Sequence, residues 1–313
     1  MKQLTKRIIS ISTLIIIIFF FGLYIKNHIS DFKQLTIVNP LYLFPLFILA
    51  FIYSINNGLV IKYLLEPFKI KMNFKEWFGL SVVTSFYNMI TPFRGGAVTR
   101  AVYLKNKYLF SYTNFFATLS GIYVINFLIA SFLGLISLIY LYYTKDILNL
   151  LVASIFLFFF IPLLIIVLFS PNFPETKSNF LNKFIGVLNG WNLIRKNRKV
   201  VLLVSLIYIL QITLFSIAGI LSYNVFGISI SFIEALFLAS IGSLTILIAI
   251  TPSGFGVVEA VAVFSALVIG ITPAQSLSVA IIGRVIGMSI IFILGPIFSY
   301  ILMKDFKKRK ESS

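Results

Sequence analysis

Apolar residues along this chain gather in long runs that are separated by short polar and basic connections. Runs near the roughly 20 residues needed to cross a bilayer core predict membrane-spanning helices. Six continuous runs predict full spans: residues 8–25, 40–62, 112–143, 149–169, 200–225 and 275–303. The first follows three basic residues, as a signal sequence does, but it lacks a small-residue cleavage site, so we expect an uncleaved span.

Two further apolar stretches, 76–104 and 232–270, are interrupted by a Thr-Pro pair followed by glycine. The interrupting residues are Thr91, Pro92, Gly95 and Gly96 in the first stretch, and Thr251, Pro252, Ser253, Gly254 and Gly256 in the second. Proline lacks an amide hydrogen and pushes the residue before it out of helical space. Each stretch is therefore predicted to form two half-helices joined by irregular backbone.

Composition agrees with a membrane protein, because 59% of the 313 residues are hydrophobic and only 11% are charged. The chain has no cysteine and a single histidine, His28, which lies in a polar connection and is expected to be solvated. We therefore predict no metal, no cofactor and no catalytic residue.

The distribution of the basic residues predicts the topology. If both interrupted stretches are re-entrant, 20 of the 26 Lys and Arg residues lie on the cytoplasmic side and three lie outside. If the first stretch crossed instead, loop 171–199 with its six basic residues would lie outside, against the positive-inside rule. We expect a multi-pass protein of the cell membrane with both termini cytoplasmic. The formal charge of +17 then reflects topology and contact with anionic headgroups rather than nucleic acid.

The same order of elements occurs twice, in residues 1–145 and 149–303, followed by a basic tail over 304–313. Three crossings in each half invert the second half relative to the first, and "TPFRGGAV" and "TPSGFGVV" occupy equivalent places. The predicted fold is a single all-α polytopic membrane domain, 1–313. It has six transmembrane helices and two re-entrant broken-helix hairpins in an inverted 3+3 repeat, an architecture typical of secondary transporters.

Two arginines suggest what the first interruption binds. A half-helix that begins near Gly95 directs unpaired N–H groups toward its start, where Arg94 stands, and Arg100 follows within two turns. Such a cluster suits an anion, and lipid phosphate is the anion most available in a bilayer. The alternative is that the arginines only brace the half-helices by pairing with Glu259 or Glu234.

Other polar residues within the apolar stretches are expected to be paired or to line a cavity. Glu259 lies one turn into its half-helix and Arg284 lies near the midplane of the last span, so we expect these two to pair. Glu234 is expected to be solvated or to cap a helix. Asn88 and Asn126 are expected to line the cavity or to bond between helices.

Loop 171–199 contains apolar residues at helical spacing, flanked by basic residues. They are Phe180, Phe184, Val187, Trp191 and Ile194. This pattern predicts a helix on the inner leaflet, either as a lipid-sensing element or as a plain connector.

At "TPFRGGAVTRAVYL", "TPSGFGVVEA" and the "GRV" of 283–285, the chain resembles the integral membrane region of lysylphosphatidylglycerol synthases. The family pattern P-x-R-x-G-E-x-x-R matches at Pro92, Arg94, Gly96 and Arg100, but its acidic position falls on Ala97. The resemblance implies a stand-alone flippase-like protein, since these 313 residues contain no counterpart of the soluble aminoacyl-transfer domain. It implies translocation of a phospholipid or an isoprenoid-linked lipid.

Three functions follow as hypotheses. The first is a lipid flippase whose substrate-binding residues are the interruption residues named above together with Arg94, Arg100, Glu259 and Arg284, and whose partners are anionic or phosphate-bearing membrane lipids. The second is a membrane partner of a separately encoded lipid- or glycan-modifying transferase. The third is an intramembrane enzyme, for which only Glu259 and Glu234 qualify as acid or base.

Overall fold

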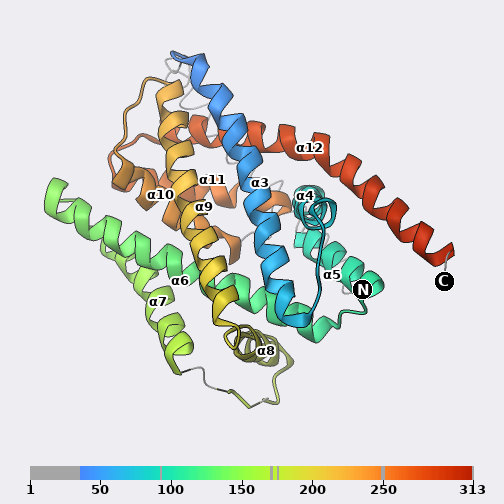
Figure 1. Ribbon diagram of the computed structural model, residues 1–313. Coiled ribbons are helices and arrows are strands. Elements are labelled where there is room, and N and C mark those ends of the chain that lie inside the picture. The colour runs from blue at the N-terminus through green and yellow to red at the C-terminus, as the bar shows by residue number, and fades with distance from the viewer. Residues whose placement is uncertain (1–35, 92–93, 170–171, 175, 248–250, 312–313) are drawn as a thin grey trace.

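The computed structural model describes residues 36–91, 94–169, 172–174, 176–247 and 251–311, and these residues form helices joined by turns (Figure 1). Five helical segments among them are long and apolar enough to cross a membrane. They are Pro40–Phe68, which contains α3 (Leu43–Leu65), α6 (Tyr112–Lys145), α7 (Leu150–Phe169), α9 (Arg198–Val225) and Pro273–Lys304 of α12 (Pro273–Glu311). Five predicted spans are thus confirmed as helices, and the sixth, 8–25, lies outside the described residues. The predicted tail from 304 continues α12 to Glu311.

Both interrupted stretches are broken, the first at Thr91 as predicted, but in the second the α-helix already ends at Leu244, before the predicted Thr251-Pro252. The first consists of α4 (Phe74–Ile90) and α5 (Gly95–Tyr108), which we call the first broken pair. The second broken pair consists of α10 (Phe232–Leu244) and α11 (Val257–Val268), with short 3-10 turns at Thr245–Leu247 and Pro252–Gly254 between them. With 12 to 17 residues, each half-helix is shorter than the roughly 20 residues that cross a bilayer core.

The helices pack crosswise between the two halves of the chain. In Figure 1, α3 and α9 run side by side through the centre, and they contact each other. Helix α12 packs on α4, with the Phe78 and Phe298 rings 5.2 Å apart, and α6 packs on α10. The last helix of each half therefore covers the first half-helix of the other half.

One glycine permits a close approach in this bundle. A β-carbon at Gly58 of α3 would lie 2.5 Å from Cε3 of Trp77 in α4, closer than any real contact. Small residues of this kind let membrane helices approach each other. Together, α3, α4, α5 and α12 form an apolar core that includes Trp77, Leu80 and Ile291.

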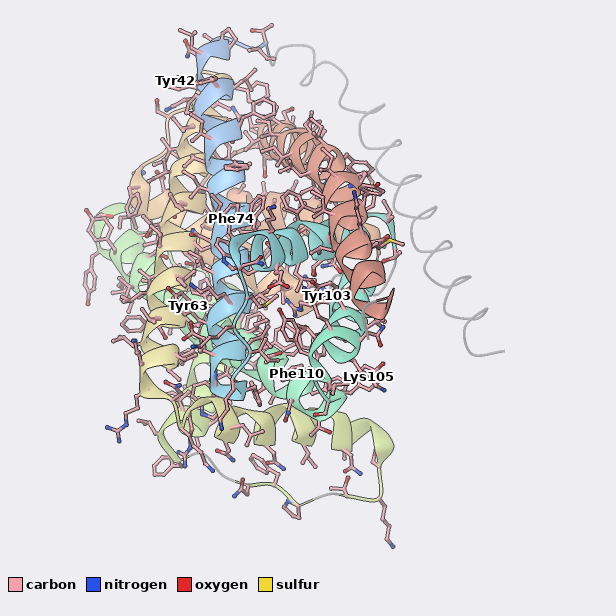
Figure 2. All side chains as sticks on the ribbon, turned by 45° about the vertical axis from the view of Figure 1, so that its right-hand side comes forward. Tyr42, Tyr63, Phe74, Tyr103, Lys105 and Phe110 are labelled. Carbon is pink, nitrogen blue, oxygen red and sulfur yellow. The ribbon has the colours of Figure 1, made fainter. Side chains whose placement is uncertain are left out.

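The predicted amphipathic segment forms α8 (Asn179–Ile194), which lies across the lower ends of α3 and α9 in Figure 2. Trp191 and Ile194 are fully buried in a core with residues of α3, α6 and α9. This end of α8 thus packs on protein, as a connector does. The side chains of Phe180, Phe184 and Val187 lie outside the described part of the chain.

Candidate functional site

A cavity of about 720 Å³ lies among the helices, and residues of α3, α4, α5, α6, α9, α10, α11 and α12 line it. Its volume falls in the range of small-molecule sites, roughly 300–1,000 Å³. The residues that line it include Asn88 and Asn126, which is one of the two roles predicted for these amides. Asn88 has the other role as well, because it bonds α5 to α4 through the N–H of Gly96. Both halves of the chain contribute to its wall.

Arg94 stands at the start of α5 and lines this cavity. Its backbone is left-handed, with φ 57° and ψ 49°, a conformation that costs a non-glycine residue roughly 1–2 kcal/mol. Its Nε is buried and has no hydrogen-bond partner. Strained backbone and an unpaired donor in one residue are typical of a functional position.

Arg100 follows six residues later on α5, lines the same cavity and is only 8% exposed. Its guanidinium lies 5.3 Å from the centre of the Phe115 ring and within electrostatic range of Arg94, Tyr123 and Tyr208. Two positive charges therefore lie near each other in a buried site.

No carboxylate neutralises these two arginines within the described residues. None of the ion pairs there involves Arg94 or Arg100, and no Asp or Glu lines the cavity. The alternative that they brace the fold by pairing with Glu259 or Glu234 is wrong, because those two carboxylates pair with Arg284 and Lys145.

The charged residue near the break of the second broken pair, Glu259, has its partners within the protein. Glu259 is buried and forms an ion pair with Arg284, which confirms the predicted pairing. The other oxygen of Glu259 accepts the N–H of Gly256 at 2.6 Å, and Arg284 lies 5.0 Å from the centre of the Phe255 ring. Neither Glu259 nor Arg284 lines the cavity, so the structure separates this pair from Arg94 and Arg100.

The turn residues are occupied with packing and turn formation. A β-carbon at Gly96 would collide with the carbonyl oxygen of Thr84, and a β-carbon at Gly95 would collide with Thr91. The N–H of Gly96 donates to Asn88 Oδ1 at 3.0 Å. These two glycines, predicted to be substrate-binding residues, thus let α4 and α5 approach each other.

In the second turn, the hydroxyl of buried Thr251 donates to the carbonyl of Phe255 at 2.8 Å. Ser253, Gly254 and Gly256 all have positive φ, at 54°, 66° and 83°. Pro92 and the side chain of Pro252 lie outside the described residues. None of the turn residues whose side chains are described lines the cavity, so of the described substrate-binding candidates only Arg94 and Arg100 do.

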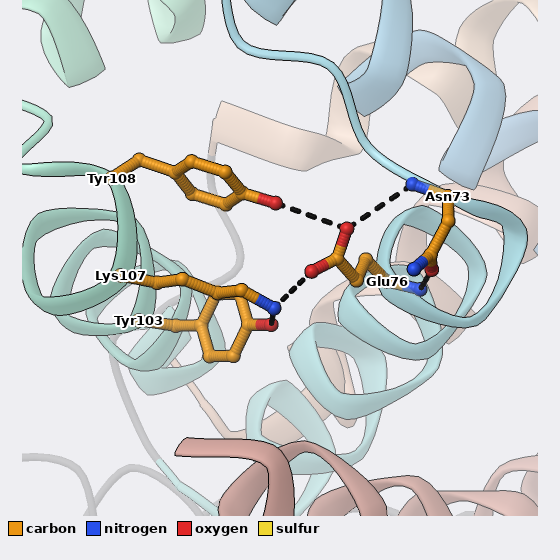
Figure 3. Close-up of polar contacts among 5 residues, drawn as sticks. All are labelled: Asn73, Glu76, Tyr103, Lys107 and Tyr108. Carbon is orange, nitrogen blue, oxygen red and sulfur yellow. Dashed lines mark hydrogen bonds and ion pairs between the residues drawn. The ribbon is translucent and has the colours of Figure 1, made fainter. Parts of the chain in front are cut away.

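Sequence reasoning missed a buried cluster between the start of α4 and the end of α5 (Figure 3). Glu76 forms an ion pair with Lys107, and both side chains are less than 10% exposed. Glu76 Oε2 accepts hydrogen bonds from Tyr108 at 3.0 Å and from the N–H of Asn73 at 3.1 Å. The Lys107 side chain is thus buried, and Glu76 joins Glu259 and Glu234 as a buried carboxylate.

One signal for this cluster was present in the sequence. Asn73-x-x-Glu76 before an apolar run is a capping box, and Ser231-x-x-Glu234 repeats it at the start of α10. Glu234 caps its helix as expected, and it also accepts a hydrogen bond from Lys145 at 2.7 Å. Nothing local in the sequence indicates the Lys107 partner, which lies 31 residues from Glu76.

Comparison with known proteins agrees with this picture. The chain matches the lysylphosphatidylglycerol synthase TM region family over residues 4–295. A UPF0104 membrane protein of Methanocaldococcus jannaschii is 28% identical to it over 97% of this chain and 98% of that protein. No solved structure matches. The chain is a multi-pass helical membrane protein that belongs to the family of the lysylphosphatidylglycerol synthase TM region.

Proposed function

We propose that this protein is a flippase-like transporter that moves a phospholipid or an isoprenoid-linked lipid between leaflets, with Arg94 and Arg100 holding the lipid phosphate. One observation carries the proposal: two arginines line a cavity, and no carboxylate among the described residues neutralises them. A buried charge without a partner is costly, so its retention in a membrane segment points to a function. A phosphate supplies the missing negative charge and fits the bidentate geometry of arginine.

Transport is a better fit to this cavity than chemistry. Acid–base catalysis on a lipid phosphate needs a proton donor or acceptor that changes state near working pH, most often a histidine or a carboxylate. The lining contains neither within the described residues. Family membership supports the same role, since the cavity lies in the membrane region that gives the family its name.

We further propose the complete topology of six spans and two re-entrant pairs in an inverted 3+3 repeat, with both termini cytoplasmic. Equivalent turn positions support it, because Arg94 and Gly254 are both left-handed at φ 57° and 66°. Capping boxes at the starts of α4 and α10 and the crosswise packing of α12 on α4 and α6 on α10 support it too. The distribution of basic residues sets the orientation.

Orientation is tested by labelling a single cysteine. The chain has no native cysteine, and Lys196, just after α8, is exposed. The Lys196→Cys variant should react with an impermeant maleimide only after the cells are opened. Labelling from outside intact cells would overturn the orientation.

The phosphate site is tested with purified protein in proteoliposomes, by flipping of labelled phosphatidylglycerol and by melting temperature in detergent. Arg94→Gln should lower flipping and binding by roughly 10- to 100-fold, the size expected for one charge-assisted hydrogen-bonding group. Flipping and binding by Arg94→Lys should lie between those of Arg94→Gln and wild type, because lysine keeps the charge but cannot bind phosphate in a bidentate way. The melting temperature should not fall with activity, since no protein carboxylate loses a partner. Normal flipping by stably folded Arg94→Gln would refute the site.

A matched pair of substitutions separates cavity charge from general damage. Ala97 lines the cavity beside the arginines, while Val257, at the equivalent position of the second broken pair, does not. Ala97→Glu should place a competing carboxylate in the site and weaken binding of phosphatidylglycerol. Val257→Glu should leave this binding intact in protein that folds. Equal losses in both variants would contradict a charge-specific site.

A further inference from the structure

A second polar group of residues lines the same cavity, and its members come from three helices. In each of α3, α6 and α9, a tyrosine that lines the cavity lies one helical turn before a side-chain amide that also lines it. We call this group the tyrosine–amide band: Tyr53, Asn57, Tyr123, Asn126, Tyr208 and Gln211.

The band has hydrogen-bonding capacity that the protein does not use. Gln211 is 6% exposed, and its Nε2 donates to Asn57 Oδ1 at 3.2 Å. Its Oε1 is buried and accepts no hydrogen bond from the described residues. Thr84 Oγ1, also in the cavity wall, is buried and unpaired in the same way. Buried polar groups are nearly always paired, so these atoms indicate a ligand with polar groups of its own.

The band adjoins Arg100. Tyr123 and Tyr208 lie within electrostatic range of the Arg100 guanidinium, and Gln211 follows Tyr208 by one turn of α9. A lipid whose phosphate contacts Arg100 would therefore place the rest of its headgroup against the band.

The chemistry of the band distinguishes between headgroups. Tyrosine hydroxyls and amides both donate and accept hydrogen bonds, as the hydroxyls of a glycerol or sugar headgroup do. An ammonium group only donates, and it is attracted by carboxylates, which the described lining lacks. Arg94 and Arg100 would also repel it.

We infer that the tyrosine–amide band binds the part of the headgroup beyond the phosphate, and that it selects an uncharged, hydroxyl-bearing headgroup over one that carries an ammonium. This inference rests on the proposed phosphate site at Arg94 and Arg100. It assigns a separate task, headgroup selection, to residues of α3, α6 and α9.

Three lipids with the same acyl chains test the inference in proteoliposomes and by binding in detergent. Phosphatidylglycerol carries hydroxyls, phosphatidylethanolamine carries an ammonium, and phosphatidic acid carries no headgroup beyond the phosphate. Wild-type protein should prefer phosphatidylglycerol to phosphatidylethanolamine by about tenfold or more, because an unmatched polar site and a like charge both disfavour the amine.

The decisive variant is Gln211→Leu, which removes the unpaired acceptor at similar size. It should lower binding and flipping of phosphatidylglycerol by about tenfold, the effect of one lost hydrogen bond to a buried group, and leave phosphatidic acid unchanged. Thr213→Val is the matched control, because Thr213 lies on the same helix outside the cavity wall. This control should bind and flip both phosphatidylglycerol and phosphatidic acid as wild type does.

The two proposals fail in different ways. If wild type does not discriminate between phosphatidylglycerol and phosphatidylethanolamine, or if Gln211→Leu lowers phosphatidic acid as much as phosphatidylglycerol, headgroup selection by the band is overturned. If Arg94→Gln handles all three lipids as wild type does, the phosphate site itself is wrong.

Discussion

The two broken pairs have similar backbone interruptions but treat the charged residues beside them differently. Each begins with a capping box, is interrupted before a Thr-Pro pair and has a glycine at an equivalent position near the start of its second half-helix, Gly96 or Gly256. In the second pair, the charge near the break, Glu259, is neutralised by Arg284 away from the cavity. In the first pair, Arg94 and Arg100 line the cavity, and none of the carboxylates that the structure describes pairs with them.

The left-handed turn position shows the same contrast. Gly254 occupies it in the second pair, where glycine adopts positive φ at no steric cost. The first pair places Arg94 there, despite the strain of that conformation. A chain optimised for stability alone would have glycine at both positions. The difference shows that the charge near the second break, Glu259, is neutralised by Arg284, whereas the first pair places an arginine in the cavity on a left-handed backbone, as the proposed phosphate site requires.

The largest expected effect comes from breaking the ion pair between Glu259 and Arg284. Glu259→Gln keeps the size of the side chain but leaves Arg284, only 14% exposed, without a carboxylate. It should destabilise the protein by about 3 kcal/mol, the lower end for a broken buried pair because Arg284 keeps some exposure. Arg100→Gln, which removes an unpaired charge, should leave stability unchanged or raise it. Melting temperatures of both variants in one detergent give the comparison.

A charge swap provides the control for this prediction. Glu259→Arg combined with Arg284→Glu should recover part of the lost stability, although the hydrogen bond from the Gly256 N–H to Glu259 is lost. If Glu259→Gln melts like wild type while Arg100→Gln unfolds, the roles assigned to the two pairs are reversed.

An intermediate effect is expected from relieving the strain at Arg94. Arg94→Gly makes this position like Gly254, and Arg94→Ala removes the same charge but keeps the strain. The glycine variant should be more stable than the alanine variant by about 1 kcal/mol, since a left-handed residue with a β-carbon costs about that much. Both variants should lose lipid flipping. Equal melting temperatures would show that the left-handed backbone stores no strain.

Most of the helical architecture was predictable because apolar run length and Thr-Pro interruptions are local features of the sequence. The spans in 40–303, both breaks and the helix after Ser178 follow from them. The Glu259–Arg284 pair was also predictable, because two buried charges of opposite sign at similar depth require each other.

The rest depends on contacts between distant residues. Lys107 has the sequence context of a loop lysine, and only the packing of α5 against α4 buries it beside Glu76. The tyrosine–amide band has no periodic signature, because each helix contributes only two residues. The packing of Gly96 against α4 was not predictable, because a glycine at a turn leaves room for a ligand or for a neighbouring helix equally well.

The smallest expected effect concerns the capping boxes that the two broken pairs share. Burial acts to raise the pKa of Glu234, but hydrogen bonds from Lys145 and Ser231 outweigh it and hold the pKa below its ordinary value. A carboxylate with a lowered pKa stabilises the folded state above the pKa of the unfolded chain, about 4.3 for Glu. That contribution is lost as the pH falls through the pKa of Glu234 in the folded state.

Because Lys145 is 46% exposed, Glu234→Gln should cost only about 0.5–1 kcal/mol of stability at pH 7. Its melting temperature should meet that of wild type as the pH falls below 4. Glu76→Gln should cost more at pH 7, because its partner Lys107 is only 5% exposed. If Glu234→Gln lowers stability more than Glu76→Gln does, burial of the partner lysine does not determine how much each capping glutamate stabilises the protein.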